Sequence, residues 1–303
     1  MKHTLKITAL LLLMFLMTQF IGLYVATHYL GEGNNLPYGL EFPKAEKESD
    51  YYGFFTAIII AFIIAIVLFL FFAKIKIEFM LKLWFFVVVL IALSISIFSL
   101  TRNFDKFLFG MPIIALLVAL PLTIIKIYRK NFLVHNLTEL MIYPGIAVIF
   151  IPILNIYTII ALLILISIYD IWAVWHSGIM QKMAKYQIDK LKIFSGFFVP
   201  YYSQGVRDKI SKWKKTLKKS ELKKKKVKIS VAILGGGDIV FPIITAGVML
   251  KTLGIYSSLL VILGATLGLA SLFFFAKKKK FYPAMPFITA GIFLAILISY
   301  LIF

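Results

Sequence analysis

The sequence contains no cysteine, which excludes disulfide bonds and thiolate-bound metal sites. Its four histidines are scattered without the spacing of metal ligands, and no HExxH zinc-protease motif is present. Acidic residues are few, since 13 Asp and Glu stand against 33 Lys and Arg. We therefore expect neither a metal nor a cofactor, and a carboxylate in apolar surroundings becomes the most informative kind of residue.

Apolar residues are abundant. Hydrophobic residues make up 61% of the 303 positions, and the mean hydropathy is +0.95, whereas soluble domains are about half apolar. The excess is gathered in stretches of about 20 residues, the length of a helix that crosses a bilayer. The sequence therefore predicts an all-α polytopic membrane protein with nine transmembrane helices, at 5–28, 53–73, 81–100, 108–127, 139–154, 156–176, 229–250, 255–275 and 281–303.

The positive charge lies between the predicted spans. The N-terminus and the second, fourth, sixth and eighth connectors are basic, the third is a weak exception, and the first, residues 31–52, is acidic. Cytoplasmic loops are enriched in Lys and Arg, so we expect a cytoplasmic N-terminus and an extracellular C-terminus in the cell membrane. The lysines would contact anionic lipid headgroups, and we expect no nucleic-acid partner. A signal peptide at residues 5–28 is the alternative, but no clear cleavage site follows.

The long sixth connector divides the chain into three parts. Residues 1–176 would hold helices one to six, 177–228 a basic cytoplasmic connector, and 229–303 helices seven to nine. The aromatic stretch 193–202 is expected to lie at the membrane surface. Glu139, near the start of the fifth span, is expected to face lipid headgroups.

Two aspartates lie inside predicted spans. Asp170 follows the apolar run 162–169, and Asp238 lies within the apolar segment 231–242. A carboxylate in hydrocarbon is costly and is usually functional. Counting an unbroken helix from the flanking lysines places both at a depth of about 15–18 Å. The sequence thus predicts two carboxylates that share one proton, the basis of aspartic-protease chemistry.

Small residues and prolines accompany these aspartates. Three glycines directly precede Asp238, and they would let either a substrate backbone or a neighbouring helix approach closely. The ninth span begins with Pro283-Ala284-Met285-Pro286, where two prolines prevent a regular helix start. Backbone groups left unpaired there could bond to an extended substrate.

Together these elements resemble the presenilin and signal-peptide-peptidase family of intramembrane aspartyl proteases. The pattern of that family is Tyr-Asp in helix six, Gly-x-Gly-Asp in helix seven and Pro-Ala-Leu before helix nine. The present chain has Tyr169-Asp170, Gly235-Gly236-Gly237-Asp238 and Pro283-Ala284-Met285-Pro286. Order, span number and spacing fit, and Met285 in place of leucine is the one departure.

The resemblance implies a presenilin-like fold and an aspartic endopeptidase that cleaves transmembrane helices with Asp170, Asp238 and an activated water. It implies that the remaining motif residues shape the site or bind substrate: Tyr169, Gly235, Gly236, Gly237, Pro283, Ala284, Met285 and Pro286. The substrates would be transmembrane-helix proteins. The charge pattern matches the orientation of presenilins, and the resemblance leaves homo-oligomerisation and partner subunits open.

Three alternatives stay open at this point. An ion-coupled transporter or channel also uses buried aspartates and proline-broken helices, although the two halves of this chain show no clear repeat. A prepilin-type peptidase also carries Gly-x-Gly-Asp, but the span count and the 283–286 motif differ. A catalytically silent protein of the same fold is the third.

Overall fold

The computed structural model describes residues 5–31, 36–43, 45–75, 78–102, 104–105, 107–108, 111–129, 131–178, 183, 186, 193–201, 206, 230–276 and 282–303. Within them the chain forms nine α-helices: α1 (Leu5–Leu30), α2 (Glu48–Ile75), α3 (Glu78–Thr101), α4 (Ile113–Tyr128), α5 (Phe132–Phe150), α6 (Ile156–Ile171), α10 (Gly237–Leu253), α11 (Ile255–Phe275) and α12 (Met285–Ile302). The shorter elements are η1 (Pro37–Gly39), η2 (Trp172–His176), β1 (Phe107–Leu108), β2 (Met111–Pro112), β3 (Gly196–Tyr201) and β4 (Ser230–Gly235).

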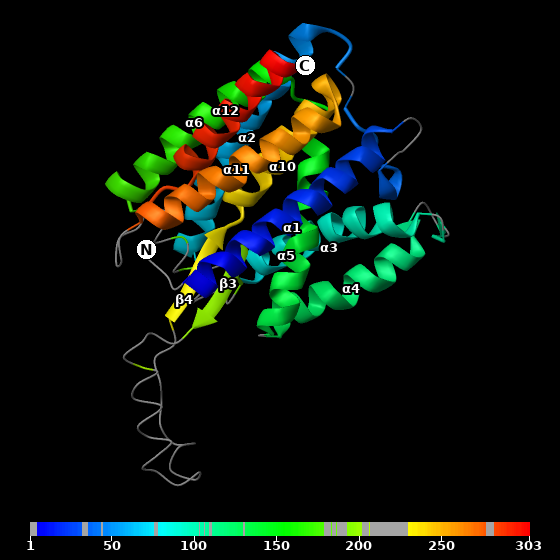
Figure 1. Ribbon diagram of the computed structural model, residues 1–303. Helices are drawn as coiled ribbons and strands as arrows, with labels where there is room; N and C mark the ends of the chain where they lie inside the picture. The colour runs from blue at the N-terminus through cyan, green and yellow to red at the C-terminus, as the bar shows by residue number, and fades with distance from the viewer. Residues whose placement is uncertain are drawn as a thin grey trace.

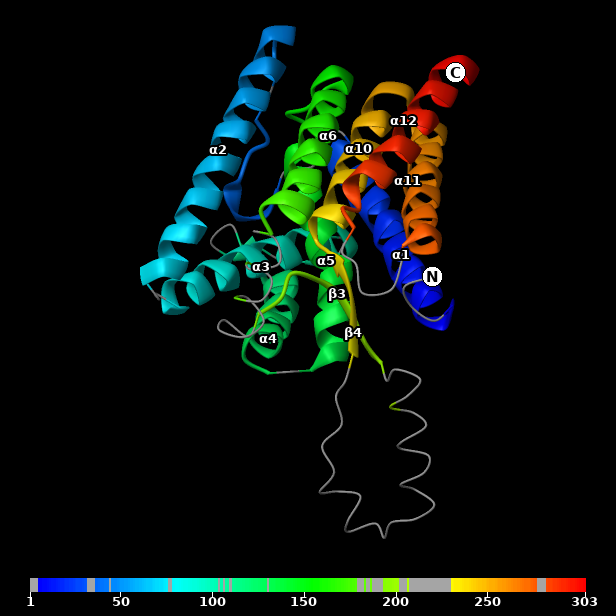
Figure 2. The same ribbon diagram turned by 90° about the vertical axis from the view of Figure 1, so that its left-hand side faces the viewer.

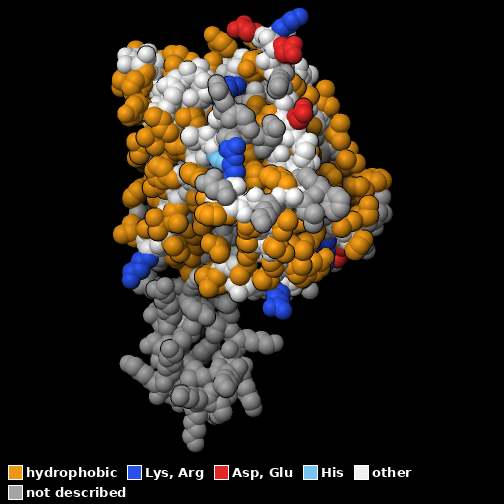
Figure 3. All heavy atoms as spheres, turned by 90° about the vertical axis from the view of Figure 1, so that its right-hand side faces the viewer, with side chains coloured by type: hydrophobic (Ala, Val, Ile, Leu, Met, Phe, Trp, Pro, Cys, Tyr) orange, Lys and Arg blue, Asp and Glu red, His pale blue; other side chains and the backbone are white. Residues whose placement is uncertain are grey.

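The helices form a bundle (Figure 1). Among the described residues, seven helical segments are long and apolar enough to cross a membrane, whereas α4 with 16 residues and α10 with 17 are shorter. Hydrophobic side chains cover most of the face seen in Figure 3, and charged side chains are few there. Helices that are apolar all round need an apolar surround, so the polytopic helical architecture is confirmed, and nine crossings stay a prediction.

One hydrophobic core joins helices from both ends of the sequence. It contains side chains of α1, α5, α6, α10, α11 and α12, including the fully buried Phe15, Leu163, Ile262 and Ile288. A second cluster joins α3 and α4 to α5. By contrast, α2 stands at the side of the bundle (Figure 2), and each of its described side chains is at least partly exposed.

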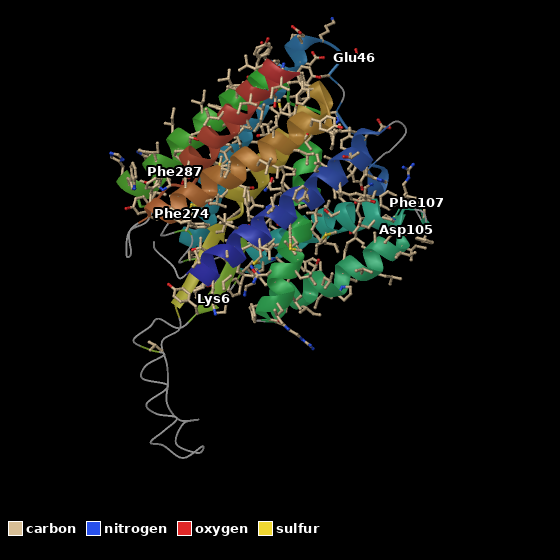
Figure 4. The ribbon with its side chains drawn as sticks, viewed as in Figure 1. Lys6, Glu46, Asp105, Phe107, Phe274 and Phe287 are labelled. Carbon is tan, nitrogen blue, oxygen red and sulfur yellow. The ribbon has the colours of Figure 1, made fainter. Side chains whose placement is uncertain are left out.

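Glycines bring α11 and α12 into close contact. A Cβ at Gly264 or Gly291 would collide with the backbone of the facing helix, and one at Gly268 would collide with the Phe287 carbonyl. Such small residues let helix backbones approach in a membrane. This packing fixes the first turns of α12, where the 283–286 motif lies, and Phe274 and Phe287 lie at this end of the helix pair (Figure 4).

The seventh predicted span was wrong as a single helix, because its first part is a strand. Residues 230–235 form β4, which pairs antiparallel with β3 from Gly196↔Gly235 to Tyr201↔Ser230, and α10 begins only at Gly237. Buried Ala232 and Leu234 alternate with exposed Val231 and Ile233, the two-residue period of a strand. A short apolar run does not by itself distinguish strand from helix.

This ribbon also gives the stretch 193–202 a structure that its sequence did not reveal. Within it β3 pairs with β4 and Phe197 is fully buried, and a place at the membrane surface stays a prediction. The fourth span likewise begins later than expected, with α4 starting at Ile113 after the short β1–β2 hairpin. Most of the connector 177–228 and the lysines at 277–280 lie outside the described residues.

Candidate active site

Asp170 lies in the last turn of α6 and is buried, with 7% of its surface exposed. Its Oδ2 accepts a hydrogen bond from the backbone N–H of Met285 at 3.0 Å, and the backbone of Ala284 also interacts with the carboxyl. These donors belong to the N-terminus of α12, where N–H groups lack partners within the helix and the helix dipole favours negative charge. The structure therefore brings the 283–286 motif to Asp170.

The surroundings of Asp170 fix α6 against α12. One turn before Asp170, the Ser167 hydroxyl donates a hydrogen bond to Thr289 Oγ1 at 2.9 Å, and both side chains are buried. Directly after Asp170 the chain continues as the π-helix η2. Single π-helical turns are frequent at functional sites, and this one ends the regular helix at the carboxylate.

Asp238 lies in the first turn of α10 and is 9% exposed. Its carboxyl is close enough to Asp170 to interact electrostatically, and the backbone of Gly235 is within hydrogen-bonding reach of it. From α1, the Gln19 side chain donates a hydrogen bond to the carbonyl of Ile239 at 3.1 Å. Because α6 packs against α10, the two aspartates meet although they are 68 positions apart in sequence.

The three glycines differ in what surrounds them. A Cβ at Gly236 would lie 2.8 Å from the Tyr143 ring and hydroxyl and 3.0 Å from Ser195 Oγ, so no larger residue fits without displacement. At Gly237 a Cβ would make only an ordinary contact with Phe241 at 3.7 Å. Gly235 ends β4 opposite Gly196. Close packing thus accounts for Gly236, whereas Gly237 leaves space beside Asp238.

The Tyr169 ring packs against aromatic neighbours. Its centroid lies 5.4 Å from that of Phe62 on α2, edge to face, and 6.3 Å from that of Trp172. Edge-to-face pairs are favourable beyond their buried area. Tyr169 therefore connects α2 to α6 immediately before Asp170.

A small apolar pocket lies where α2 faces α6 and α10. Its lining is entirely hydrophobic: Ile58, Ile59, Phe62, Leu162, Leu165, Ile166 and Phe241. Ile166 lies about one turn before Asp170, and Phe241 about one turn after Asp238. The pocket therefore lies about one helical turn from each aspartate.

The outer edge of β3 is bonded to α5. The Asn136 side chain donates to the Phe198 carbonyl at 2.9 Å and accepts from the Phe198 N–H at 3.1 Å. His135 Nε2 lies 2.9 Å from the Gly196 carbonyl. In an antiparallel strand alternate residues direct their backbone groups to opposite sides. The backbone groups of Phe197 and Val199 therefore face β4.

A buried charge pair accompanies this contact. Glu139, expected at the headgroups, is only 1% exposed and forms an ion pair with Lys126 of α4. The expectation was wrong because the position of α4 beside α5 decides its environment. Polar residues at 135, 136, 139 and 143 share one helix face, a spacing that could have revealed an inward polar face. Within the described segments no group of three or more His, Asp or Glu could hold a metal ion.

Comparisons with known proteins identify the fold and the family. The family model for signal-peptide peptidase and presenilin aspartyl protease matches residues 37–303. A solved presenilin family intramembrane aspartate protease in a C222 crystal superposes with a TM-score of 0.62 at 17% identity, covering 98% of this chain and 99% of that one. A presenilin family intramembrane aspartate protease solved in a P2 crystal superposes with a TM-score of 0.61 at 18% identity, and the match covers 97% of each chain.

No curated protein sequence matches the chain. The two solved structures share its fold, and the family model covers most of its length, so the alternative of a transporter or channel is not favoured. The predicted resemblance of the chain to this family is thereby confirmed. The chain belongs to the signal-peptide peptidase and presenilin family of intramembrane aspartyl proteases, and it is a hydrolase.

Proposed function

We propose that this protein is an endopeptidase that cleaves transmembrane helices with Asp170 and Asp238 as a catalytic pair. The observation that carries the proposal is the meeting of two buried carboxyl groups, from α6 and α10, at the N-terminus of α12. Two carboxylates this close in a low dielectric do not both ionise. They hold one proton between them, as aspartic proteases require.

In the proposed reaction the ionised carboxylate takes a proton from a water molecule, and the water oxygen attacks the carbonyl carbon of the scissile bond. The protonated partner donates a hydrogen bond to the carbonyl oxygen. As the diol intermediate collapses, the C–N bond breaks and the leaving nitrogen receives a proton. The proton belongs to the pair, so neither aspartate is named as the base.

The Met285 amide would orient Asp170 in this reaction. Its N–H bonds to Oδ2, which restricts how the carboxyl group can turn. A hydrogen bond from a backbone amide costs no reorganisation during the reaction because α12 already holds it in place. The 283–286 motif would thus act on the carboxylate itself. This role is additional to the hydrogen bonds with substrate that we predicted for its unpaired backbone groups.

The free edge of the β3–β4 ribbon would bind the unwound part of the substrate. Since α5 bonds the outer edge of β3, the backbone groups of Ala232 and Leu234 face β3, and those of Val231 and Ile233 face away. Among the described residues, no backbone hydrogen bond from outside the ribbon reaches Val231 or Ile233. An extended substrate segment can add there as a third strand, which leads it towards Gly235 and Asp238.

The helical part of the substrate would lie against the apolar surface beside α2, over the small apolar pocket. Its lining offers no hydrogen-bonding side chain, so it suits the apolar surface of a transmembrane helix. A helical peptide bond is protected by its own hydrogen bonds, and the substrate must unwind before attack. We propose that Gly237 leaves room for the unwound backbone and that Tyr169 lines its path.

The proposed orientation has nine crossings, with the N-terminus cytoplasmic and the C-terminus extracellular. Lys6 and the β3–β4 ribbon lie at one end of the bundle and Glu46 at the other (Figure 4), which fits basic groups inside and acidic groups outside. Water would then enter from the cytoplasmic side, and the basic connectors would contact anionic lipid. Substrates would have an N-out, C-in helix.

The test is cleavage of a purified helical membrane substrate by the full-length protein in detergent. The expected result is cleavage that is blocked by a hydroxyl-containing transition-state analogue and is absent in Asp170→Ala and Asp238→Ala. Cleavage that persists in both variants would refute the proposal. Ion flux in proteoliposomes that needs these aspartates, with no cleavage by any form, would instead establish a transporter.

A further inference from the structure

The inward face of α5 carries polar side chains, and some of them contact the ribbon. His135, Asn136, Glu139 and Tyr143 are each at most 9% exposed, although α5 is otherwise largely apolar. Residues with this spacing lie on one side of a helix. Buried polar side chains are costly unless they are hydrogen-bonded, so the partners of this face indicate what it does.

The Asn136 side chain forms, at the outer edge of β3, the hydrogen bonds that the backbone of another strand would form. Its side-chain amide supplies one donor and one acceptor, and both are used by the same residue, Phe198. This is the exchange that a neighbouring strand would make with that residue. The contact therefore specifies which residue of β3 lies opposite α5.

His135 adds a second contact two residues earlier on β3. The Lys126 ammonium lies 3.3 Å from His135 Nδ1, and an ammonium can only donate, so Nδ1 accepts and Nε2 carries the proton. Nε2–H then donates to the Gly196 carbonyl at 2.9 Å. The buried ion pair of Lys126 with Glu139 holds the ammonium in place, and through it the tautomer of the imidazole.

The contacts of this face continue to the residues before Asp238. Gly196, bonded by His135, pairs across the ribbon with Gly235. The next residue, Gly236, lies against the Tyr143 side chain, two turns further along α5. Contacts therefore link the register of β3 on α5 to the end of β4 and the start of α10.

We propose that Asn136 and His135 are positioning residues for Asp238, acting through the β3–β4 ribbon. The inference rests on the proposed function of Asp238. Without these side chains the backbone groups of Gly196 and Phe198 lose their partners, and β3 is no longer held in one register. A slip of one residue along a strand reverses every side chain, and it would move Gly235 away from the carboxyl groups.

The experiment compares Asn136→Leu, which has a similar size but no hydrogen bonds, with Tyr29→Phe. The control removes a comparable buried bond, from the Tyr29 hydroxyl to the Ile95 carbonyl at 2.8 Å, away from the ribbon. We expect Asn136→Leu to lower kcat for a helical substrate on the order of a hundredfold, the effect of a displacement near 1 Å. Exchange of the β4 amides with deuterium should become faster. Tyr29→Phe should change neither quantity.

A cross-link provides the rescue. Phe198 and Ile233 are cross-strand partners whose backbone groups face outward, a type of pair with Cα atoms about 4.5 Å apart, within the range of a disulfide. Because the chain has no cysteine, Phe198→Cys with Ile233→Cys gives one defined bond. Oxidation should restore the kcat of Asn136→Leu towards that of the cross-linked parent, and reduction should remove the gain.

The inference is overturned if Asn136→Leu cleaves like the control, or if its loss persists when the cross-linked parent is active. If the cross-linked parent is itself inactive, unchanged β4 exchange in Asn136→Leu overturns it. If Asn136→Leu does not fold, Asn136→Ser takes its place, because the serine side chain is too short to make both hydrogen bonds. The same changes in kcat and in β4 exchange are then expected. If Asp238→Ala cleaves the substrate as fast as the wild type, the proposed function is refuted instead. The deuterium exchange of the β4 amides would still test the effect of Asn136 on the ribbon.

Discussion

Asp170 on α6 accepts a hydrogen bond from the backbone N–H of Met285 at 3.0 Å, across 115 residues of sequence. The bond joins the first of the three motifs to the last, and Asp238 completes the group from α10. Three helices thus converge on one buried pair of carboxyl groups. We propose that this convergence is what allows the protein to hydrolyse a peptide bond inside the membrane.

One substitution removes the Met285 amide. Met285→Pro lacks the N–H, and proline is tolerated at the start of a helix, so Asp170 loses this hydrogen bond; the variant also loses the buried Met285 side chain. Hydrogen bonds to charged groups contribute about 1.5–3 kcal/mol, and we expect kcat to fall about tenfold or more. Met285→Ala loses the same buried side chain but keeps the amide, and it should be the more active of the two. Equal rates for the two variants, measured with purified protein, would show that this bond does not matter.

Close packing at Gly236 predicts a contrast with its neighbour. Gly236→Ala places a Cβ against Tyr143 and Ser195, and overpacking of this kind costs about 1–3 kcal/mol. Gly237→Ala meets only an ordinary contact with Phe241. Thermal unfolding in detergent should therefore show a lower Tm for Gly236→Ala than for Gly237→Ala, and the reverse order would contradict the packing described here.

The two aspartates could be predicted from the sequence because a carboxylate in an apolar run is rare whatever its neighbours are. The helix at 255–275 was also predicted correctly, as α11 covers Ile255–Phe275. Strand β4 was not, since the apolar run 231–234 fits a buried helix as well as a strand. Only its pairing with β3, some thirty residues earlier in the chain, decides between them.

The ion pair of Lys126 and Glu139 was missed for a related reason. Each charge lies near the end of a predicted span, where a contact with headgroups is the ordinary expectation. Which residue faces which across two helices depends on their rotation and depth, and one sequence does not contain that information. The roles of Asn136 and His135 became visible only with the position of β3.

This ion pair leads to a prediction about stability. Glu139→Leu leaves the Lys126 ammonium buried without its carboxylate, and breaking a buried pair costs about 3–5 kcal/mol. Adding Lys126→Met removes the unpaired charge and should recover much of the loss. Resistance to unfolding by heat or by SDS measures both effects. A single variant as stable as the wild type would show that the pair is not buried as described.

The packing of Tyr169 predicts which part of its side chain matters. Its ring contacts Phe62 and Trp172, so Tyr169→Phe should keep the contact and cleave nearly as fast as the wild type. Tyr169→Ala loses the ring pairs, each about 0.5–1.5 kcal/mol beyond buried area, and should cleave more slowly. Loss of activity in Tyr169→Phe would assign the hydroxyl a role at Asp170 instead.

The most direct test of the central claim is the rate of peptide-bond cleavage in Asp170→Asn, Asp238→Asn and the double variant, each compared with the wild type. Asparagine keeps the size of the side chain, but its amide can neither ionise nor carry the shared proton. Groups that act as one unit are strongly non-additive. We therefore predict that each single variant loses all cleavage above background and that the double variant is no worse. Wild-type rates in either single variant would contradict the shared pair.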